Sequence, residues 1–184
     1  MQNLSVRYEP TPNPATMKFR FSEKLVATPA EFTHSNETDR SPLAAKIFGF
    51  PWTSAVFLGE DFVTVTKQDW VDWDVLAEPL AGLIQEHLQS GQPLITDLPD
   101  SSNQDDSNDT PFIKNVKQAL NREIRPVVAL DGGDVVFNRF EDGILYLQMK
   151  GACAGCPSSS ATLKEGIEVR LKELFPEITE IRAV

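Results

Sequence analysis

The sequence has few of the side chains that bind soft metals. Its 184 residues include only two cysteines and two histidines. A mononuclear zinc site or an iron–sulfur cluster ordinarily takes four protein ligands. Neither histidine is a good candidate, because His87 falls in the apolar pattern of a helix, which favours a packed side chain, and His34 lies in a polar loop. One chain alone therefore offers too few ligands for a complete site of either kind.

Other absences argue against further classes of protein. No apolar stretch approaches the roughly 18 residues that a bilayer span needs. Residues 1–7 lack the basic patch and apolar core of a secretion signal and the arginine-rich character of a transit peptide. Basic residues with interleaved aromatics are missing, and the net charge is −10. We therefore expect a cytoplasmic protein that binds neither membrane nor nucleic acid and keeps its cysteines reduced.

The negative charge is concentrated in the first part of the chain and in one polar segment. Residues 1–98 carry 7 basic and 13 acidic side chains, whereas residues 111–184 carry ten of each sign. Between them, residues 99–110 contain four aspartates and no apolar residue after the initial proline. Such a segment cannot bury enough surface to offset the entropy of ordering it. The predicted fold class is α+β, with two small α+β domains, 1–98 and 111–184, joined by a flexible, disordered acidic linker, 99–110.

The pattern of residues 111–184 predicts the element order α-β-β-α-β. Apolar residues fall at helical spacing over 112–124, and Pro126 is expected to end that helix. Two strands, 134–140 and 144–150, follow on either side of a hairpin turn at 141–143. A second helix comes after the cysteines, and a short strand over 177–184 closes the domain.

Residues 1–98 are also predicted to form an α+β domain. Residues 6–9 and 17–21 read as extended, and residues 56–58 and 62–66 as a hairpin. A helix is expected through residues 80–88, which Pro79 either starts or kinks, and a shorter helix near 43–48. The domain shows no catalytic group of residues. Trp52, Trp70 and Trp73 are candidates for a partner patch, although most of them are expected in the core.

The most informative motif is Cys153-Ala154-Gly155-Cys156. Pro157 suits the first position of a helix, which places both sulfurs near the positive end of the helix dipole. That field favours the thiolate, the form that ligates metals and attacks disulfides. A four-thiolate site would need the cysteines of two chains in a symmetric dimer. We expect such a site to be exposed and easily dismantled, which suits a carrier.

The same spacing also occurs in dithiol–disulfide oxidoreductases. In a thioredoxin-like site the proline usually lies between the cysteines, in the strand-to-helix turn of a βαβ unit. Here Pro157 follows the second cysteine, and the preceding strand is assigned to a hairpin. The spacing alone leaves both metal and redox chemistry open, and zinc at the same dimer interface is a third possibility.

Several longer motifs resemble a known family. Residues 111–184 contain Ile124-Arg125-Pro126, Asp131-Gly132-Gly133-Asp134-Val135, the cysteine stretch 151–159 and residues 162–168, in this order. This series resembles the C-terminal NifU-like domain, a scaffold and carrier domain of iron–sulfur cluster assembly. Residues 11–19, 41–44 and 62–67 resemble the companion N-terminal domain of Nfu-type proteins. Pro51-Trp52 departs from the resemblance, because a proline–glycine turn is expected there.

The resemblance implies a specific function. An Nfu-type protein is a homodimer that binds one [4Fe–4S] cluster per dimer through paired cysteines, so Cys153 and Cys156 are implied as the ligands. It is implied to be a carrier and not an enzyme, which takes the cluster from an upstream donor and passes it to apo-proteins. The Asp131–Asp134 stretch is favoured as a tight glycine turn. We expect residues 1–98 to dock client or donor proteins.

Overall fold

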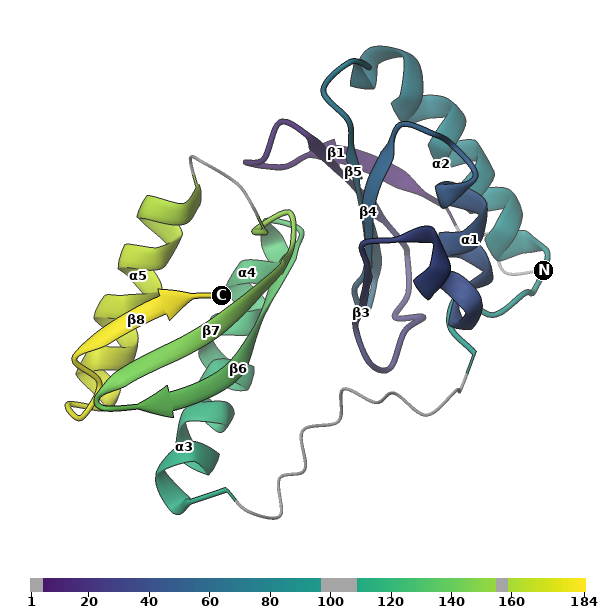
Figure 1. Cartoon of the computed structure of the whole chain (residues 1–184). Coiled ribbons are helices and arrows are strands. Elements are labelled where there is room, and N and C mark those ends of the chain that lie inside the picture. The colour runs from purple at the N-terminus through teal and green to yellow at the C-terminus, as the bar shows by residue number, and fades with distance from the viewer. Residues whose placement is uncertain (1–4, 97–108, 155–158) are drawn as a thin grey trace. The chain divides into compact units, whose positions relative to one another are not determined.

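The structure is a computed structural model that describes residues 5–96, 109–154 and 159–184, with the side chains of 159–164 excepted. It divides into two compact units, Met1–Leu98 and Pro99–Val184. Both units combine helices with a sheet, so the predicted α+β fold class is confirmed (Figure 1). Most of the segment predicted as a linker lies outside the described residues.

The N-terminal unit is built on an antiparallel sheet with the strand order β1-β2-β5-β4-β3. Its strands are β1 Arg7–Pro10, β2 Thr16–Arg20, β3 Ala30–Phe32, β4 Thr53–Leu58 and β5 Phe62–Lys67. Its helices are the 3₁₀ helix η1 Ser35–Arg40, α1 Pro42–Phe48 and α2 Trp73–Gln89. The predicted hairpin is confirmed as β4 and β5, in which Val56 lies opposite Val65. Strand β3 is too short for a readable alternation and was not predicted.

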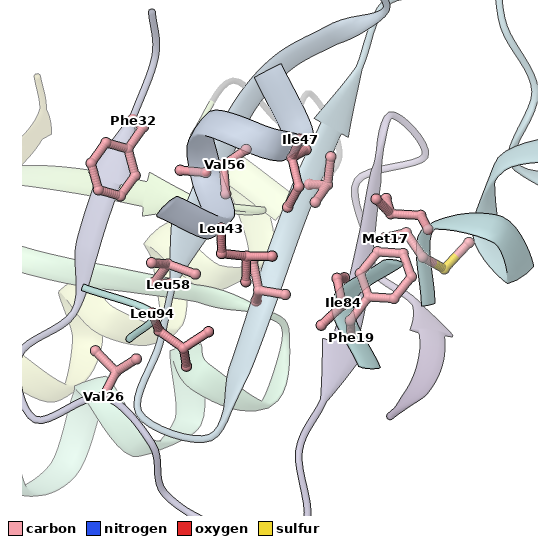
Figure 2. Close-up of a cluster of buried hydrophobic side chains, with 14 of the residues drawn as sticks. Met17, Phe19, Val26, Phe32, Leu43, Ile47, Val56, Leu58, Ile84 and Leu94 are labelled. Carbon is pink, nitrogen blue, oxygen red and sulfur yellow. The ribbon is translucent and has the colours of Figure 1, made fainter. Parts of the chain in front are cut away.

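Alternating side chains of the sheet form the core of this unit with the helices. Phe19 of β2 and Val56 of β4 are fully buried, as are Leu43 and Ile47 of α1 and Ile84 of α2 (Figure 2). Helix α1 begins where the sequence supplies a cap, because the Ser41 hydroxyl accepts a hydrogen bond from the Ala44 N–H at 3.1 Å. Proline at position 42 then occupies the first helical position, where its missing N–H costs nothing.

Pro79 lies inside α2, six positions after its first residue Trp73. The alternative that this proline starts the helix is therefore wrong. None of the described helices combines the length and the apolar character that a bilayer span requires.

The C-terminal unit has the predicted order α-β-β-α-β. Its elements are α3 Pro111–Ala119, the π-helical turn η3 Leu120–Ile124, α4 Arg125–Leu130, β6 Gly133–Glu141, β7 Ile144–Gly151, α5 Ser159–Leu174 and β8 Glu180–Ala183. The sheet order is β6-β7-β8, with β7 antiparallel to β6 and parallel to β8. The hairpin turn uses Asp142 and Gly143 at φ values of 51° and 80°, which is typical of the primed turns that join paired strands.

The prediction that Pro126 ends the first helix is wrong, since helical structure continues to Leu130. Proline in a regular helix lacks one donor and clashes with the carbonyl four residues earlier. Here the π turn widens the helix just before the proline, and the Arg125 N–H donates to the Leu120 carbonyl, five residues back. Pro126 then lies in the first turn of α4, where it is tolerated.

The widened turn keeps one face of the α3–α4 segment directed at the core. Val116, Leu120, Ile124 and Val128 follow at intervals of four and are all buried. They belong to a cluster with strand residues such as Leu145 and with Ile167, Leu171, Ile178 and Ile181. This packing holds α4 against the start of β6, which lies next to the cysteine loop.

His87 of α2 is buried, with 1% of its surface exposed, as the apolar helix pattern predicted. The Lys46 Nζ donates to its Nδ1 at 3.1 Å, and its Nε2 lies 3.3 Å from the Pro93 carbonyl oxygen. Burial lowers the pKa of His87 below its ordinary value of 6.5. The Pro93 carbonyl opposes this shift, and the Lys46 ammonium adds to it.

The N-terminal unit should therefore lose stability in mild acid. Below pH 6.5 the unfolded chain binds a proton at His87 that the folded state resists, so the free energy of unfolding falls as the pH drops. Thermal unfolding should show a lower midpoint at pH 5.5 than at pH 7.5. The variant His87→Gln should show a smaller difference between these two pH values. An equal difference in both proteins would assign the effect to other groups.

Candidate metal-ligand site

Cys153 lies two residues after the end of β7, in a loop that the neighbouring strand start holds in place. The Ala152 N–H donates to the Gly132 carbonyl at 3.1 Å, and the Ala154 N–H donates to the Gly151 carbonyl at 3.0 Å. Gly151 has a φ of 63°, a left-handed conformation that favours glycine. Cys156 and the predicted first helical residue Pro157 lie outside the described residues, and the described part of α5 begins at Ser159.

The backbone of Gly133 passes directly against the Cys153 side chain. Gly133 pairs with Gly151 at the start of β6. A Cβ atom at position 133 would overlap Cys153 Sγ and would lie 2.8 Å from the Lys150 carbonyl oxygen. Position 133 therefore requires glycine, because the Cys153 thiol occupies the space that the side chain of any other residue would need.

Cys153 is only 7% exposed and belongs to the hydrophobic cluster of the C-terminal unit. We expected an exposed site, and this expectation is wrong for Cys153 in the single chain. The physical reason is the contact with Gly133, which draws the loop against the strand and turns the sulfur toward the core.

Asp134 connects the start of β6 to α4 through a charged contact that the sequence did not reveal. The Arg125 guanidinium donates from Nε to Oδ1 and from Nη2 to Oδ2 of Asp134, both at 2.6 Å. The same Oδ1 accepts the Val135 N–H at 2.8 Å. A two-point contact of this kind with a carboxylate that is 93% buried fixes geometry strongly. Arg125 and Asp134 thus hold the strand that carries Gly133.

The aspartate–glycine stretch also forms the tight turn that the sequence favoured. The Asp131 N–H donates to the Val128 carbonyl and the Gly132 N–H to the Ala129 carbonyl, both at 3.1 Å. Gly132 has a φ of 80°, which a residue with a side chain rarely adopts. Gly132 therefore allows the turn to form, whereas Gly133 leaves space for the Cys153 thiol.

Strand β7, which precedes the cysteines, belongs to more than a hairpin, so one predicted difference from thioredoxin-like sites is wrong. Strand β7 pairs with β6 in a hairpin, as predicted, but it also pairs in parallel with β8. The segment β7-α5-β8 is therefore a βαβ unit, and the cysteine motif lies in its strand-to-helix connection. The position of Pro157 after the second cysteine remains as a difference from such redox sites.

The tryptophans of the N-terminal unit divide into packed and exposed side chains. Trp52 is 8% exposed and its ring packs against those of Phe50 and Trp73, with centroid distances of 5.2 and 6.4 Å. Trp70, in contrast, is 69% exposed. The prediction that most of the tryptophans pack in the core is therefore confirmed, since Trp52 is buried and Trp73 packs against the same cluster. Trp70 is the exception. His34 is exposed, as predicted. Among the described residues, neither histidine belongs to a group of side chains that could hold a metal ion.

Comparisons with known proteins agree on both units. Residues 6–91 match the family described as scaffold protein Nfu/NifU N terminal, and residues 116–182 match the NifU-like domain. The chain is 36% identical over 183 residues to the human NFU1 iron-sulfur cluster scaffold homolog, mitochondrial. This chain belongs to the Nfu family of iron–sulfur cluster scaffold proteins. The family predicted from the motifs is therefore confirmed.

Other relatives give the same picture. NifU-like protein 5, mitochondrial, from Arabidopsis thaliana is 38% identical over 183 residues. The alignments cover 98% of this chain and 72% of the human protein, and 96% of this chain and 66% of the Arabidopsis protein. The chain thus spans about two thirds of the length of such relatives. A solution structure of a NifU-like protein from Saccharomyces cerevisiae covers 53% of this chain and 89% of that chain, with 24% identity and a TM-score of 0.47, too low to add an argument.

These relatives correct the predicted location. The human and Arabidopsis proteins are mitochondrial by name, so the cytoplasmic location expected from residues 1–7 is wrong. The expectation rested on the absence of a targeting pattern at the start of the given sequence. Such an absence carries little weight in a chain that covers only part of its relatives' length.

A pair of glycine substitutions tests the geometry beneath the thiol. Gly133→Ala should destabilise the C-terminal unit by about 1–3 kcal/mol, because Cys153 and the Lys150 carbonyl must both move away from the added methyl group. The control Gly166→Ala lies in α5 with nothing within 4 Å of its added Cβ, and should stabilise by about 0.5–1 kcal/mol through helix propensity. Urea unfolding measures both. Equal effects of the two substitutions on the free energy of unfolding would contradict a close contact between position 133 and Cys153.

Proposed function

We propose that this protein carries a [4Fe–4S] cluster as cargo between two copies of the chain. Cys153 and Cys156 of each copy would ligate it, and the dimer would pass it to apo-proteins after receiving it from an upstream donor. The single observation that carries the proposal is the shortage of ligands, within the described residues, around buried Cys153 in a chain of the scaffold family. The protein acts in this view as a carrier without catalysing a reaction of its own.

The ligand shortage extends through the described structure. Across residues 5–96, 109–154 and 159–184, no three His, Cys, Asp or Glu side chains gather into a group that could hold a metal ion. A cubane cluster held by protein thiolates takes four of them. The chain has two in total, so a second copy is the simplest source of the others.

The burial of Cys153 fits a cargo role better than a permanent metal site. In the single chain the sulfur packs against Gly133, within the hydrophobic cluster of the unit. Cluster binding requires this sulfur to turn outward, and cluster release allows it to return to its packed position. The packed state therefore stabilises the empty protein and favours handing the cargo on.

The N-terminal unit offers a surface suited to docking the donor or a client. Trp70, which precedes α2, is 69% exposed, and Val75 in the first turn of α2 is 65% exposed. Asp69, Asp72 and Asp74 are exposed beside them in the same stretch, which contains no basic residue. An exposed aromatic side chain with an acidic surround is complementary to a basic partner segment that carries an apolar anchor. We propose that the partner has this chemistry.

A dithiol–disulfide oxidoreductase remains the second candidate, because the cysteine motif lies in the strand-to-helix connection of a βαβ unit. This function requires a reversible disulfide between Cys153 and Cys156 within one chain. Turnover in an insulin or glutathione-coupled assay would support it. Inactivity in both assays, in protein that binds a cluster, would remove it.

Anaerobic reconstitution with iron and sulfide tests the carrier directly. We expect about four iron atoms per two chains, and Mössbauer spectra of a cubane cluster. Cys153→Ser and Cys156→Ser should each abolish cluster binding, because each removes two of the four ligands from the dimer. The control Ala154→Ser changes the exposed residue between them without removing a thiol and should bind normally. Full iron content in either cysteine variant would contradict the ligand assignment.

The docking proposal has a separate test. Trp70→Ser should slow cluster transfer to a physiological client by about tenfold, because it removes the central apolar anchor of the surface. Iron content of the loaded protein should stay unchanged. Gln68→Ser, a nearby exposed position, serves as the matched control and should transfer at the normal rate. Equal transfer rates for both variants would place docking elsewhere.

A further inference from the structure

We propose that Val127 and Leu130 of α4 form the contact surface for the second copy of the chain when the cluster is bound. This inference rests on the proposed function, since it names the surface on which the two halves of that site meet. Val127 is 54% exposed and Leu130 is 72% exposed. They are three residues apart on a helical segment and therefore share one side of it.

Backbone hydrogen bonds place this surface beside the ligand loop. The Gly132 N–H donates to the Ala129 carbonyl in the last turn of α4, and the Gly132 carbonyl accepts the Ala152 N–H next to Cys153. One residue thus connects the end of α4 with the cysteine loop. Figure 1 shows α4 beside β6, and the Gly132–Ala152 hydrogen bond brings the residues after α4 next to those after β7. A second chain that brings its own cysteines to this loop must lie against the neighbouring end of α4.

The opposite face of α4 supports the same arrangement. Val128 is fully buried in the core of the unit, and the Arg125 guanidinium is held by Asp134. These contacts fix the helix rigidly, so the exposed side chains are presented in one orientation. A preformed surface loses little conformational entropy on association.

The charge pattern favours a copy of the same chain as the occupant. In a symmetric contact each surface meets its own image, so like charges would repel. Residues 127–133 carry a single charged side chain, Asp131, and residues 151–154 carry none. The other basic and acidic residues of the unit lie outside these two stretches. An almost uncharged apolar surface around a shared ligand is self-complementary.

Paired aspartate substitutions test this surface in the full chain. Val127→Asp/Leu130→Asp should weaken the cluster-bound dimer by at least about tenfold, measured as the concentration dependence of sedimentation under anaerobic conditions. Val169→Asp is the matched control, because Val169 is 59% exposed on α5 of the same unit. It should leave the dimer unchanged. Circular dichroism and the melting temperature of the empty proteins confirm that all variants fold.

The outcomes separate this inference from the proposed function. A wild-type protein that binds no cluster, or binds it as a monomer, overturns the proposed function and the inference with it. The second outcome is that the wild-type protein forms the cluster-bound dimer and the double variant dimerises as tightly as Val169→Asp. This result overturns the inference alone. A double variant that keeps its dimer but transfers the cluster slowly shows that the surface receives clients, and this result also overturns the inference.

Discussion

The close contact between Cys153 and the backbone of Gly133 is the constraint on which the site depends. It exists because position 133 has no side chain, and because the Arg125–Asp134 ion pair holds the beginning of β6 against α4. The contact buries the thiol that we propose as a cluster ligand. It gives the sulfur a packed position within the hydrophobic cluster of the unit. Under the proposed function, cluster binding then competes with this packing.

Other elements of the C-terminal unit position the two residues of this contact. Helix α4 can reach the start of β6 only because helical structure continues past Pro126, and the π turn η3 makes that possible. The strand β7 serves two partners, since it forms the hairpin with β6 and the parallel pair with β8. The left-handed conformations of Gly132 and Gly151 lie where these elements meet the cysteine loop.

Much of this structure could be predicted from local patterns, and the exceptions have physical causes. The turn at residues 141–143 lies in a short stretch of sequence, so the hairpin of β6 and β7 was predicted correctly. The short helix α1 was also predicted near its observed position, whereas its Ser41 cap was not. Pro126 misled because the π turn that accommodates it depends on tertiary packing. The parallel pairing of β8 with β7 depends on the path of the chain in space, which no local pattern contains.

The candidate site likewise has features that could be predicted from the sequence and features that could not. Cys153 was found from its spacing to Cys156 and from the surrounding family motifs. Its burial could not be predicted, because the Gly133 backbone that covers it is distant in sequence. The role of Arg125 was missed for a similar reason, although both it and Asp134 lie within recognised motifs. A count of ligands, in contrast, needs no structure, and it remains the main argument for a second chain.

The central claim is that one chain holds half of a cluster site. Native mass spectrometry of the anaerobically reconstituted protein tests it most directly, because it weighs chains and cluster together. We predict a species of two chains with four iron and four sulfide, and no cluster on single chains. A single 20.5 kDa chain that carries the complete cluster would contradict the account.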